Sequence, residues 1–262
     1  MSVSEKKVVY RHMTIASYKS AAEIDPLNRL SSIQANSSQT EFRTNDEFIQ
    51  IDDFLPHSLL CSMQESLPQL EPYIHRSFIP KHKKGGSISR FDLDLNAPIF
   101  SSIYTSASLR SFLSSVVGKS LLYCPESDPH AYAVYSYDRE GDHIGFHYDK
   151  SYYRGSRYTC LIGLVDDSCC ALEYELFSKD DRKETIMCST KISPGSLVFF
   201  NGDNIRHRVT PAKPRDKRTV LTLEYLTDKG ISNFGYFYGQ LKDAFEYFGV
   251  GKTLARLLKK PQ

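Results

Sequence analysis

The sequence lacks several features that mark membrane, nucleic-acid-binding and secreted proteins. No apolar run approaches the ~18 residues that a helix needs to cross a bilayer, so no membrane partner is expected. The 33 basic and 31 acidic side chains leave a formal charge of +2, which gives the chain little attraction for polyanions. The composition therefore argues against a nucleic-acid partner.

Cysteine usage also lacks a pattern. The six cysteines include no C-x-x-C pair and show no regular spacing, and no apolar signal-like segment begins the sequence. These absences predict a cytoplasmic protein with reduced thiols. The adjacent Cys169 and Cys170 admit two interpretations, a redox pair or small buried thiols, and buried thiols are the commoner situation.

The chain is long enough, at 262 residues, to bury a full core in one domain or in two small ones. Residues 1–46 are polar and predict an N-terminal arm or linker. We expect a single domain over residues 47–262. Its β-rich core should span about residues 130–227, and apolar residues at helical spacing predict C-terminal helices over 235–260.

The region before the β-rich core mixes element types. Residues 47–55 alternate apolar with polar and predict a short strand, and Pro56 opens a helix with an apolar stripe. Residues 75–86 are basic, lack helical periodicity and end in Gly-Gly, which indicates a mobile loop. A second amphipathic helix is expected over residues 107–117.

From residue 132 the chain consists of short β-branched or aromatic segments separated by turn residues. The predicted strands are 132–137, 158–165, 172–176, 185–189, 196–200 and 219–225. Many short strands at this spacing favour a sandwich or jelly roll over alternating β-α units. The expected fold class is therefore mainly β with flanking helices.

Three residues in this region can form a metal site. His147 and Asp149 are two apart on a predicted strand, so they should share a face, and His207 follows a later turn. Two imidazoles and one carboxylate form a facial triad that leaves positions open on non-haem Fe(II). Arg218, eleven residues past His207, can bind a carboxylate bidentately beside that metal.

Zinc is the main alternative metal, because His143 and His147 are four residues apart. The helical zinc motif H-E-x-x-H requires a glutamate directly after the first histidine. Ile144 occupies that position, and the segment is predicted as a turn followed by a strand. We therefore reject the zinc interpretation.

The combined pattern resembles a known family. Y-x-x-x-G-x-x-x-x-x-H-x-D from Tyr137, G-S-L-V-F-F-N-G-x-x-x-x-H up to His207, and then Arg218 are similar to Fe(II)/2-oxoglutarate-dependent dioxygenases over about residues 130–227. The resemblance implies a double-stranded β-helix, a cupin-like jelly roll, with Fe(II), 2-oxoglutarate and O2 as cofactors. It also implies that His147, Asp149 and His207 are the catalytic iron ligands. Arg218 would hold the distal carboxylate of 2-oxoglutarate, and Tyr137 would be a hydrogen-bond donor to the co-substrate.

The sequence around these motifs resembles one smaller group within the family. H-Y-D-K-S-Y-Y-R-G-S-R-Y-T, L-E-Y-L-T-D and the aromatic segment L-K-D-A-F-E-Y-F-G are similar to stand-alone enzymes acting on free amino acids, which include hydroxylases and halogenases. The halogenases replace the carboxylate ligand by a small residue, whereas this chain keeps Asp149. The resemblance therefore implies hydroxylation of a free amino acid, for example a basic one such as lysine, with release of succinate and CO2.

A free amino acid needs a cation for its carboxylate and acceptors for its ammonium. Arg90 can supply the cation, His130 and Asp142 flank the predicted mouth, and Thr222 and Glu224 share the parity that faces inward. A surface ion pair or a turn cap is the structural alternative for each, above all for Asp142 in its Gly-Asp turn. The basic residues 81–84 can form a lid over the site or a solvated loop.

Other functional classes stay open at this point. Similar glycine-turn-H-x-D arrangements occur in protein side-chain hydroxylases and in nucleic-acid demethylases, although a near-neutral charge disfavours the latter. A non-catalytic jelly-roll binding module ranks last, because it would tolerate loss of a ligand. The C-terminal aromatic segment can form a homodimer surface or pack on the barrel.

Overall fold

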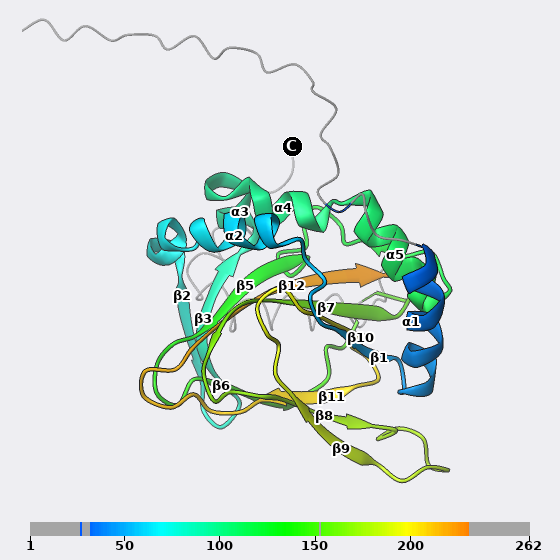
Figure 1. Cartoon of the computed structure of the whole chain (residues 1–262). Helices are drawn as coiled ribbons and strands as arrows, with labels where there is room; N and C mark the ends of the chain where they lie inside the picture. The colour runs from blue at the N-terminus through cyan, green and yellow to red at the C-terminus, as the bar shows by residue number, and fades with distance from the viewer. Residues whose placement is uncertain (1–26, 28–31, 152, 231–262) are drawn as a thin grey trace, which may run out of the picture.

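A computed structural model describes residue 27 and residues 32–151 and 153–230 (Figure 1). The C-terminal helices predicted over 235–260, and with them the homodimer surface, lie outside these residues. None of the helices in the described ranges is long and apolar enough to span a membrane.

The described chain is dominated by one antiparallel sheet of twelve strands that curls into two facing layers. The strands are β1 (Phe48–Ile51), β2 (His75–Ile79), β3 (Lys83–Ser89), β4 (Leu122–Tyr123), β5 (Tyr132–Tyr137), β6 (His143–His147), β7 (Arg157–Asp167), β8 (Leu172–Leu176), β9 (Ile186–Thr190), β10 (Leu197–Asn201), β11 (Arg206–Val209) and β12 (Lys217–Leu226). Their order is β1-β10-β7-β12-β5-β3-β6-β11-β8-β9, with β2 beside β3 and β4 beside β12. This is the predicted jelly-roll class, and the prediction is confirmed.

Helices cover the outer face of the layer that contains β5, β12 and β7 (Figure 1). They are α1 (Ser32–Thr44), α2 (His57–Glu65), α3 (Arg90–Asn96), α4 (Pro98–Tyr104) and α5 (Ala107–Val117), with a 3-10 helix at Pro68–Tyr73. Helix α5 has the predicted bounds, begins at the side-chain cap of Ser106 and ends at Gly118 in the left-handed conformation. The short helices α3 and α4 were not predicted.

Strand alternation separates the interior into two apolar clusters. Along β12, Leu221 and Leu223 pack toward the helices, whereas Val220 faces the space between the two layers. Strand β7 alternates in the same way, with Cys160 and Ile162 facing the helices. The space between the two layers is therefore lined by the sheet face that the helices do not cover.

The prediction of a mobile loop over residues 75–86 is wrong. Strands β2 and β3 form a hairpin there, and β3 is inserted between β5 and β6 in the sheet. The Gly-Gly that suggested a loop allows close packing instead. A Cβ on Gly86 would lie 2.7 Å from Ile74 Cγ2. Pairing with a strand distant in sequence thus overrides the loop-like composition.

Part of the segment predicted as an arm or linker is also ordered. Residues 32–44 form α1, and the Phe42 side chain is fully buried. Its ring stacks on Phe199 with centroids 5.4 Å apart and contacts Tyr158 at 6.3 Å. The helix is polar in composition, so one buried aromatic side chain did not produce a recognisable amphipathic pattern.

Candidate metal centre

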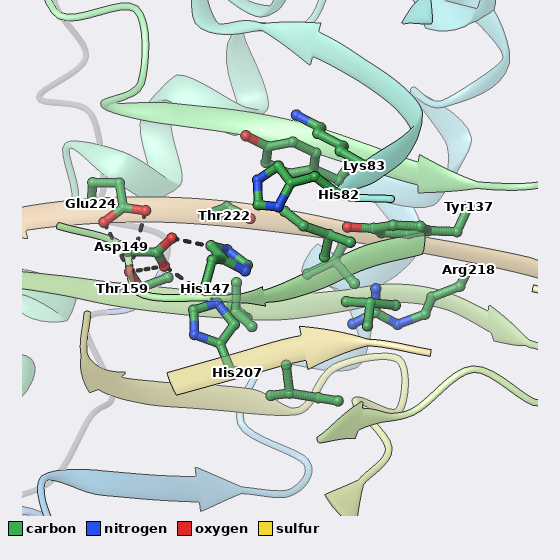
Figure 2. A pocket seen from close by; sticks show the side chains of 16 residues that line it. His82, Lys83, Tyr137, His147, Asp149, Thr159, His207, Arg218, Thr222 and Glu224 are labelled. Atoms are coloured by element: carbon green, nitrogen blue, oxygen red, sulfur yellow. Dashed lines mark hydrogen bonds and ion pairs between the residues drawn. The ribbon is translucent and has the colours of Figure 1, made fainter. Parts of the chain in front are cut away.

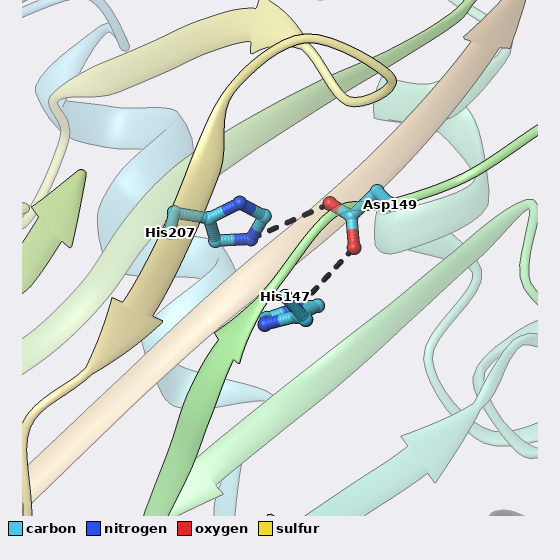
Figure 3. A group of neighbouring side chains, drawn as sticks. All are labelled: His147, Asp149 and His207. Carbon is cyan, nitrogen blue, oxygen red and sulfur yellow. Dashed lines mark ion pairs between the residues drawn. The ribbon is translucent and has the colours of Figure 1, made fainter. Parts of the chain in front are cut away.

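His147, Asp149 and His207 converge in space, as Figure 3 shows. His147 and His207 are directly opposite each other in the antiparallel pair of β6 and β11, and their ring centroids lie 4.3 Å apart. Asp149 differs from the expectation, because β6 ends at His147 and Asp149 follows the strand. Its carboxylate still lies 3.3 Å from His147 Nε2 and 3.5 Å from His207 Nε2.

The backbone orients both imidazoles for metal binding. His147 Nδ1 lies 2.8 Å from the carbonyl of Gly145, and His207 Nδ1 lies 3.2 Å from that of Ile205. A proton on each Nδ1 satisfies these carbonyls and leaves each Nε2 with a free lone pair on the side of Asp149. The ligand atoms of the three residues all lie within 4.8 Å of one another, close enough to share one ion.

Protonation states in the site favour a cation. Burial lowers the pKa of His207 to about 4, so its imidazole is neutral at physiological pH. Burial alone would raise the pKa of Asp149, but the adjacent His207 and His147 hold it well below its usual range. Neutral imidazole and ionised carboxylate are the forms that bind metals.

A buried polar network lies behind Asp149. The Thr159 hydroxyl is 2.8 Å from Asp149 Oδ2 and 3.1 Å from Glu224 Oε2. Arg157 Nε donates to Glu224 at 2.9 Å, and both side chains are nearly inaccessible to solvent. Burial raises the pKa of Glu224 to about 8, although the Arg157 charge opposes that rise.

The number of protons available in the Asp149–Thr159–Glu224 network determines which groups can donate hydrogen bonds. A threonine hydroxyl has one proton, which it donates to the ionised Asp149, so it can only accept from Glu224. The raised pKa of Glu224 favours its protonated form, which is the form that can donate to the hydroxyl 3.1 Å from Oε2. Thr159 therefore holds Oδ2 of Asp149, the oxygen that faces His207, while Oδ1 faces His147.

A buried cation lies at the other end of the site. Arg218 is 3% exposed, and its guanidinium carbon lies 5.1 Å from the ring centroid of Tyr137, its partner on β5. Burial lowers the pKa of Arg218, but a guanidinium starting at 12.5 remains charged at neutral pH. Burial also raises the pKa of Tyr137 to about 12, so its phenol remains a proton donor.

A single cavity joins the triad to Arg218, as Figure 2 shows. Its walls come from β3, β5, β6, β7, β8, β11 and β12, so both layers contribute. Of the residues predicted as substrate contacts, Thr222 and Glu224 line it. The three candidate metal residues, Arg218 and Tyr137 also line it.

The other predicted substrate contacts are not among the described residues that line this cavity. Arg90 stacks over Tyr132 with its guanidinium carbon 5.2 Å from the ring centroid. Asp142 is fully buried in its turn, where it accepts the backbone N–H groups of Asp138 and Arg139. Asp142 thus serves as the turn cap that was its structural alternative. The His130 backbone N–H donates to Asp128 at 2.8 Å.

Several lining residues were not predicted. Thr159 was placed on a strand without a functional role, and His82 and Lys83 belonged to the supposed loop. A signal for the buried network was present, because Arg157 is a charged residue directly before the mainly apolar segment 158–165. Such a charge needs a buried partner, which Glu224 supplies from β12.

One family model and several solved structures are similar to this chain. The model described as Halogenase D matches residues 30–154, just under half of the sequence. The matched segment includes His147 and Asp149 and ends before His207. No curated protein sequence matches the chain.

The similar structures are oxygenases of one fold. The α-ketoglutarate-dependent epimerase SnoN from nogalamycin biosynthesis, in complex with Fe3+, α-ketoglutarate and nogalamycin RO, has a TM-score of 0.61 at 10% identity, over 75% of this chain and 84% of its own. A Pseudomonas putida prolyl-4-hydroxylase has a TM-score of 0.56 at 14% identity, over 74% and 99%. A Trichoplax adhaerens prolyl hydroxylase in complex with a hypoxia inducible factor peptide has 0.58 at 15%, over 77% and 95%. At identities this low, the structural similarity shows a shared fold and nothing further.

Proposed function

We propose that this protein is an Fe(II)- and 2-oxoglutarate-dependent dioxygenase that hydroxylates an unactivated C–H bond of a free amino acid. The observation that carries the proposal is a two-histidine, one-carboxylate cluster in the same cavity as a buried arginine. The fold shared with SnoN, whose structure contains Fe3+ and α-ketoglutarate, supports the same cofactors here. A cytoplasmic location and a homodimer remain predictions.

The donor set fits Fe(II). Two imidazoles and a carboxylate lining one cavity could hold a ferrous ion and leave coordination positions open to co-substrates. Thr159 satisfies one carboxylate oxygen, which favours monodentate binding by the other. At the far end, Arg218 is placed to bind the distal carboxylate of a dicarboxylic keto acid, with Tyr137 beside it.

Fe(II) with bound 2-oxoglutarate supplies the oxidising chemistry: O2 delivers one oxygen atom to succinate, formed with loss of CO2, and the other to the substrate C–H bond. The chain's own residues position these reactants. Arg218 and Tyr137 fix the keto acid, and the Thr159–Glu224–Arg157 network fixes Asp149. Apolar lining residues such as Leu161 and Val220 limit water around the reacting groups.

Hydroxylation is favoured over halogenation, despite the similarity to the Halogenase D model. A halide would need a coordination position, and Asp149 fills that position with a charged carboxylate. Gly202 packs against it, since a Cβ there would be 2.8 Å from Asp149 Cβ. We expect an Asp149→Gly variant to lose hydroxylation, measured as product formed per succinate.

The first test of the proposal is spectroscopic. Fe(II) and 2-oxoglutarate added to the protein without oxygen should produce the weak visible charge-transfer band of a chelated ferrous ion. A His147→Ala variant should lose the band, because it removes one of three ligands. A Cys61→Ala variant, altered on α2 outside the cavity lining, should keep it. Absence of the band in the unmodified protein would overturn the proposal.

The second test identifies the substrate. The common amino acids are offered with 2-oxoglutarate and O2, and mass spectrometry looks for products that gain one oxygen atom in step with succinate. One or more amino acids should be converted. The protein should give no such product with 2-oxoglutarate omitted.

A protein side-chain hydroxylase is the second candidate, because two of the similar structures are prolyl hydroxylases and one contains a peptide. In that case the charge-transfer band would form, free amino acids would remain unchanged, and a peptide would gain oxygen. Screening free amino acids and peptides for oxygen gain therefore separates the two candidate functions without any variant.

A further inference from the structure

Asp149 lies beyond the end of the strand that carries His147 (Figure 3). His147 and His207 are held opposite each other by the pairing of β6 with β11, whereas Asp149 belongs to the connection that follows β6. The Thr159 hydroxyl orients the Asp149 carboxylate, but a hydrogen bond to the end of a side chain does not fix the backbone that bears it. The position of Asp149 therefore depends on what holds this connection.

The turn between β10 and β11, residues 202–205, contacts the connection through one carboxylate. Asp203 Oδ1 accepts the backbone N–H of Ser151 at 2.8 Å, and Asp203 Oδ2 accepts the backbone N–H of Arg157 at 2.9 Å. Ser151 is two residues past Asp149, and Arg157 is the first residue of β7. Asp203 thus joins the segment that bears Asp149 to a central strand of the sheet, and hydrogen bonds to a carboxylate are among the stronger ones.

The backbone of the same turn packs directly on Asp149. A Cβ on Gly202 would lie 2.8 Å from Asp149 Cβ and 3.0 Å from the Asp149 carbonyl oxygen. The Gly202 N–H donates to the Arg157 carbonyl at 2.8 Å, and the Asp203 N–H donates to Asn201 Oδ1 at 3.0 Å. The turn is therefore itself held in place, and it can act as a rigid support for Asp149.

The chain is also held on the other side of Asp149. Lys179 Nζ lies 4.3 Å from the ring centroid of Tyr148 and donates to the backbone carbonyl of Asp203. The hydroxyls of Tyr148 and Ser178 are 3.3 Å apart. Contacts at residues 148 and 151 thus enclose Asp149, and both sets of contacts include Asp203.

We propose that Asp203 is a positioning residue for the metal centre, because its carboxylate fixes the connection after β6 and so sets the place of Asp149 relative to the histidines. The inference rests on the metal centre of the proposed function. The turn that contains Asp203 leads directly into β11 and His207, so one rigid segment fixes two of the three candidate ligands. Asp149 Oδ2 and His207 Nε2 lie 3.5 Å apart across it. Residues that orient the ligands of a metal raise its affinity by about ten- to a hundredfold.

The test is anaerobic calorimetric titration of metal-free protein with Fe(II), without 2-oxoglutarate or substrate. Asp203→Ala removes both backbone acceptors and should weaken Fe(II) binding about ten- to a hundredfold. Asp203→Asn keeps one acceptor oxygen and should lose less. At saturating Fe(II) and 2-oxoglutarate, the charge-transfer band of Asp203→Ala should also have a shifted maximum, because the carboxylate ligand is displaced.

Asp216 provides a matched control at the Arg218 end of the site. Its Oδ2 accepts the backbone N–H groups of Lys213 at 2.8 Å and Cys169 at 3.2 Å, so it too joins two segments that are distant in sequence. Asp216→Ala therefore removes the same kind of contact from another connection. Denaturant unfolding should show a loss of stability in both alanine variants, whereas only Asp203→Ala should lose Fe(II) affinity.

Two results would overturn the inference. Asp203→Ala could bind Fe(II) as tightly as the unmodified protein, or Asp216→Ala could lose as much affinity. If Asp203→Ala does not fold, the same comparison is made with Asp203→Asn and Asp216→Asn. Failure of the proposed function looks different, because the unmodified protein would then give no charge-transfer band or oxidise no free amino acid. Failure of this inference alone leaves both properties intact, and an unmodified protein that binds no Fe(II) would contradict both.

Discussion

At the residue scale, Thr159 links Asp149, the proposed metal ligand, to Glu224 and Arg157. We expect Thr159→Val to weaken Fe(II) binding about ten- to a hundredfold, because the isosteric valine removes the hydrogen bond that orients the carboxylate. Thr159→Ser keeps the hydroxyl and should bind nearly as well as the unmodified protein. Anaerobic titration of metal-free protein with Fe(II) measures both. Equal affinities for the valine and serine variants would show that the contact has no orienting role.

Glu224 should make stability depend on pH in an unusual direction. Its pKa rises from 4.5 to about 8 on folding, so the protonated form favours the folded state. That contribution is fully present below about pH 4.5 and is lost as the pH rises through about 8. His207 acts oppositely at lower pH, since its pKa falls from 6.5 to about 4. Between about pH 6.5 and pH 8, Glu224 therefore changes the free energy of unfolding with pH while His207 does not.

Glu224→Gln tests this expectation, because glutamine resembles the protonated acid. Denaturant unfolding of metal-free protein at several pH values should show stability falling from about pH 6.5 to pH 8 in the unmodified protein. The variant should show a flatter profile over the same range, while His207 titrates alike in both. Parallel profiles would mean that Glu224 is ionised throughout, as the partner of Arg157.

The sequence was most informative for residues whose spacing along the chain reflects their spacing in the fold. His147 and Asp149 are two apart, and the interval from His207 to Arg218 spans one connection between strands. Thr159 and Glu224 meet across β7 and β12, at 65 residues' separation. No local pattern reports such a contact, and Arg90 shows the converse, since a plausible cation can have its partners elsewhere.

At the element scale, the adjacent glycines Gly85 and Gly86 of β3 differ in how tightly they pack. A Cβ on Gly86 would lie 2.7 Å from Ile74 Cγ2, whereas one on Gly85 would make ordinary contacts, the nearest at 3.5 Å. We expect Gly86→Ala to destabilise the protein by about 1–3 kcal/mol, the usual cost of overpacking. Gly85→Ala should cost less. Denaturant unfolding measures both, and equal values would contradict the tight packing of Gly86.

Elements were predicted well where local periodicity and tertiary environment agree. Helix α5 has an apolar stripe, a serine cap and a C-terminal glycine, and its bounds match the expectation. The hairpin has basic residues, a proline and two glycines, and it is a strand pair because β5 and β6 supply its neighbours. Helices α3 and α4 have seven residues each, too few for a helical period to emerge from the sequence.

At the scale of the whole molecule, α1 is attached to the barrel through Phe42. We expect Phe42→Ala to lower the free energy of unfolding by about 3–5 kcal/mol, because it empties a fully buried site against Phe199 and Tyr158. Glu41→Ala, one residue earlier on the exposed side of the helix, should have little effect. Thermal or denaturant unfolding checks the pair. A small effect of Phe42→Ala would mean that α1 packs without contributing to stability.

The fold class could be predicted because many short strands with turn residues between them have few stable arrangements. The strand order could not, since β3 precedes β5 and β6 in the chain by many residues and yet lies between them. Its insertion carries Lys83 into the cavity, so the missed topology and the missed lining residue have one cause.

The distribution of the site over two layers has a consequence for how such a protein can diversify. The histidines come from β6 and β11, whereas positions 218, 220, 222 and 224 come from β12 in the opposing layer. Mutations at Val220 or Thr222 can reshape what the cavity admits while the two histidines stay in register across β6 and β11. Selectivity can thus drift over generations without loss of reactivity. Thr159 limits that freedom, because it joins Asp149 to Glu224 across the layers.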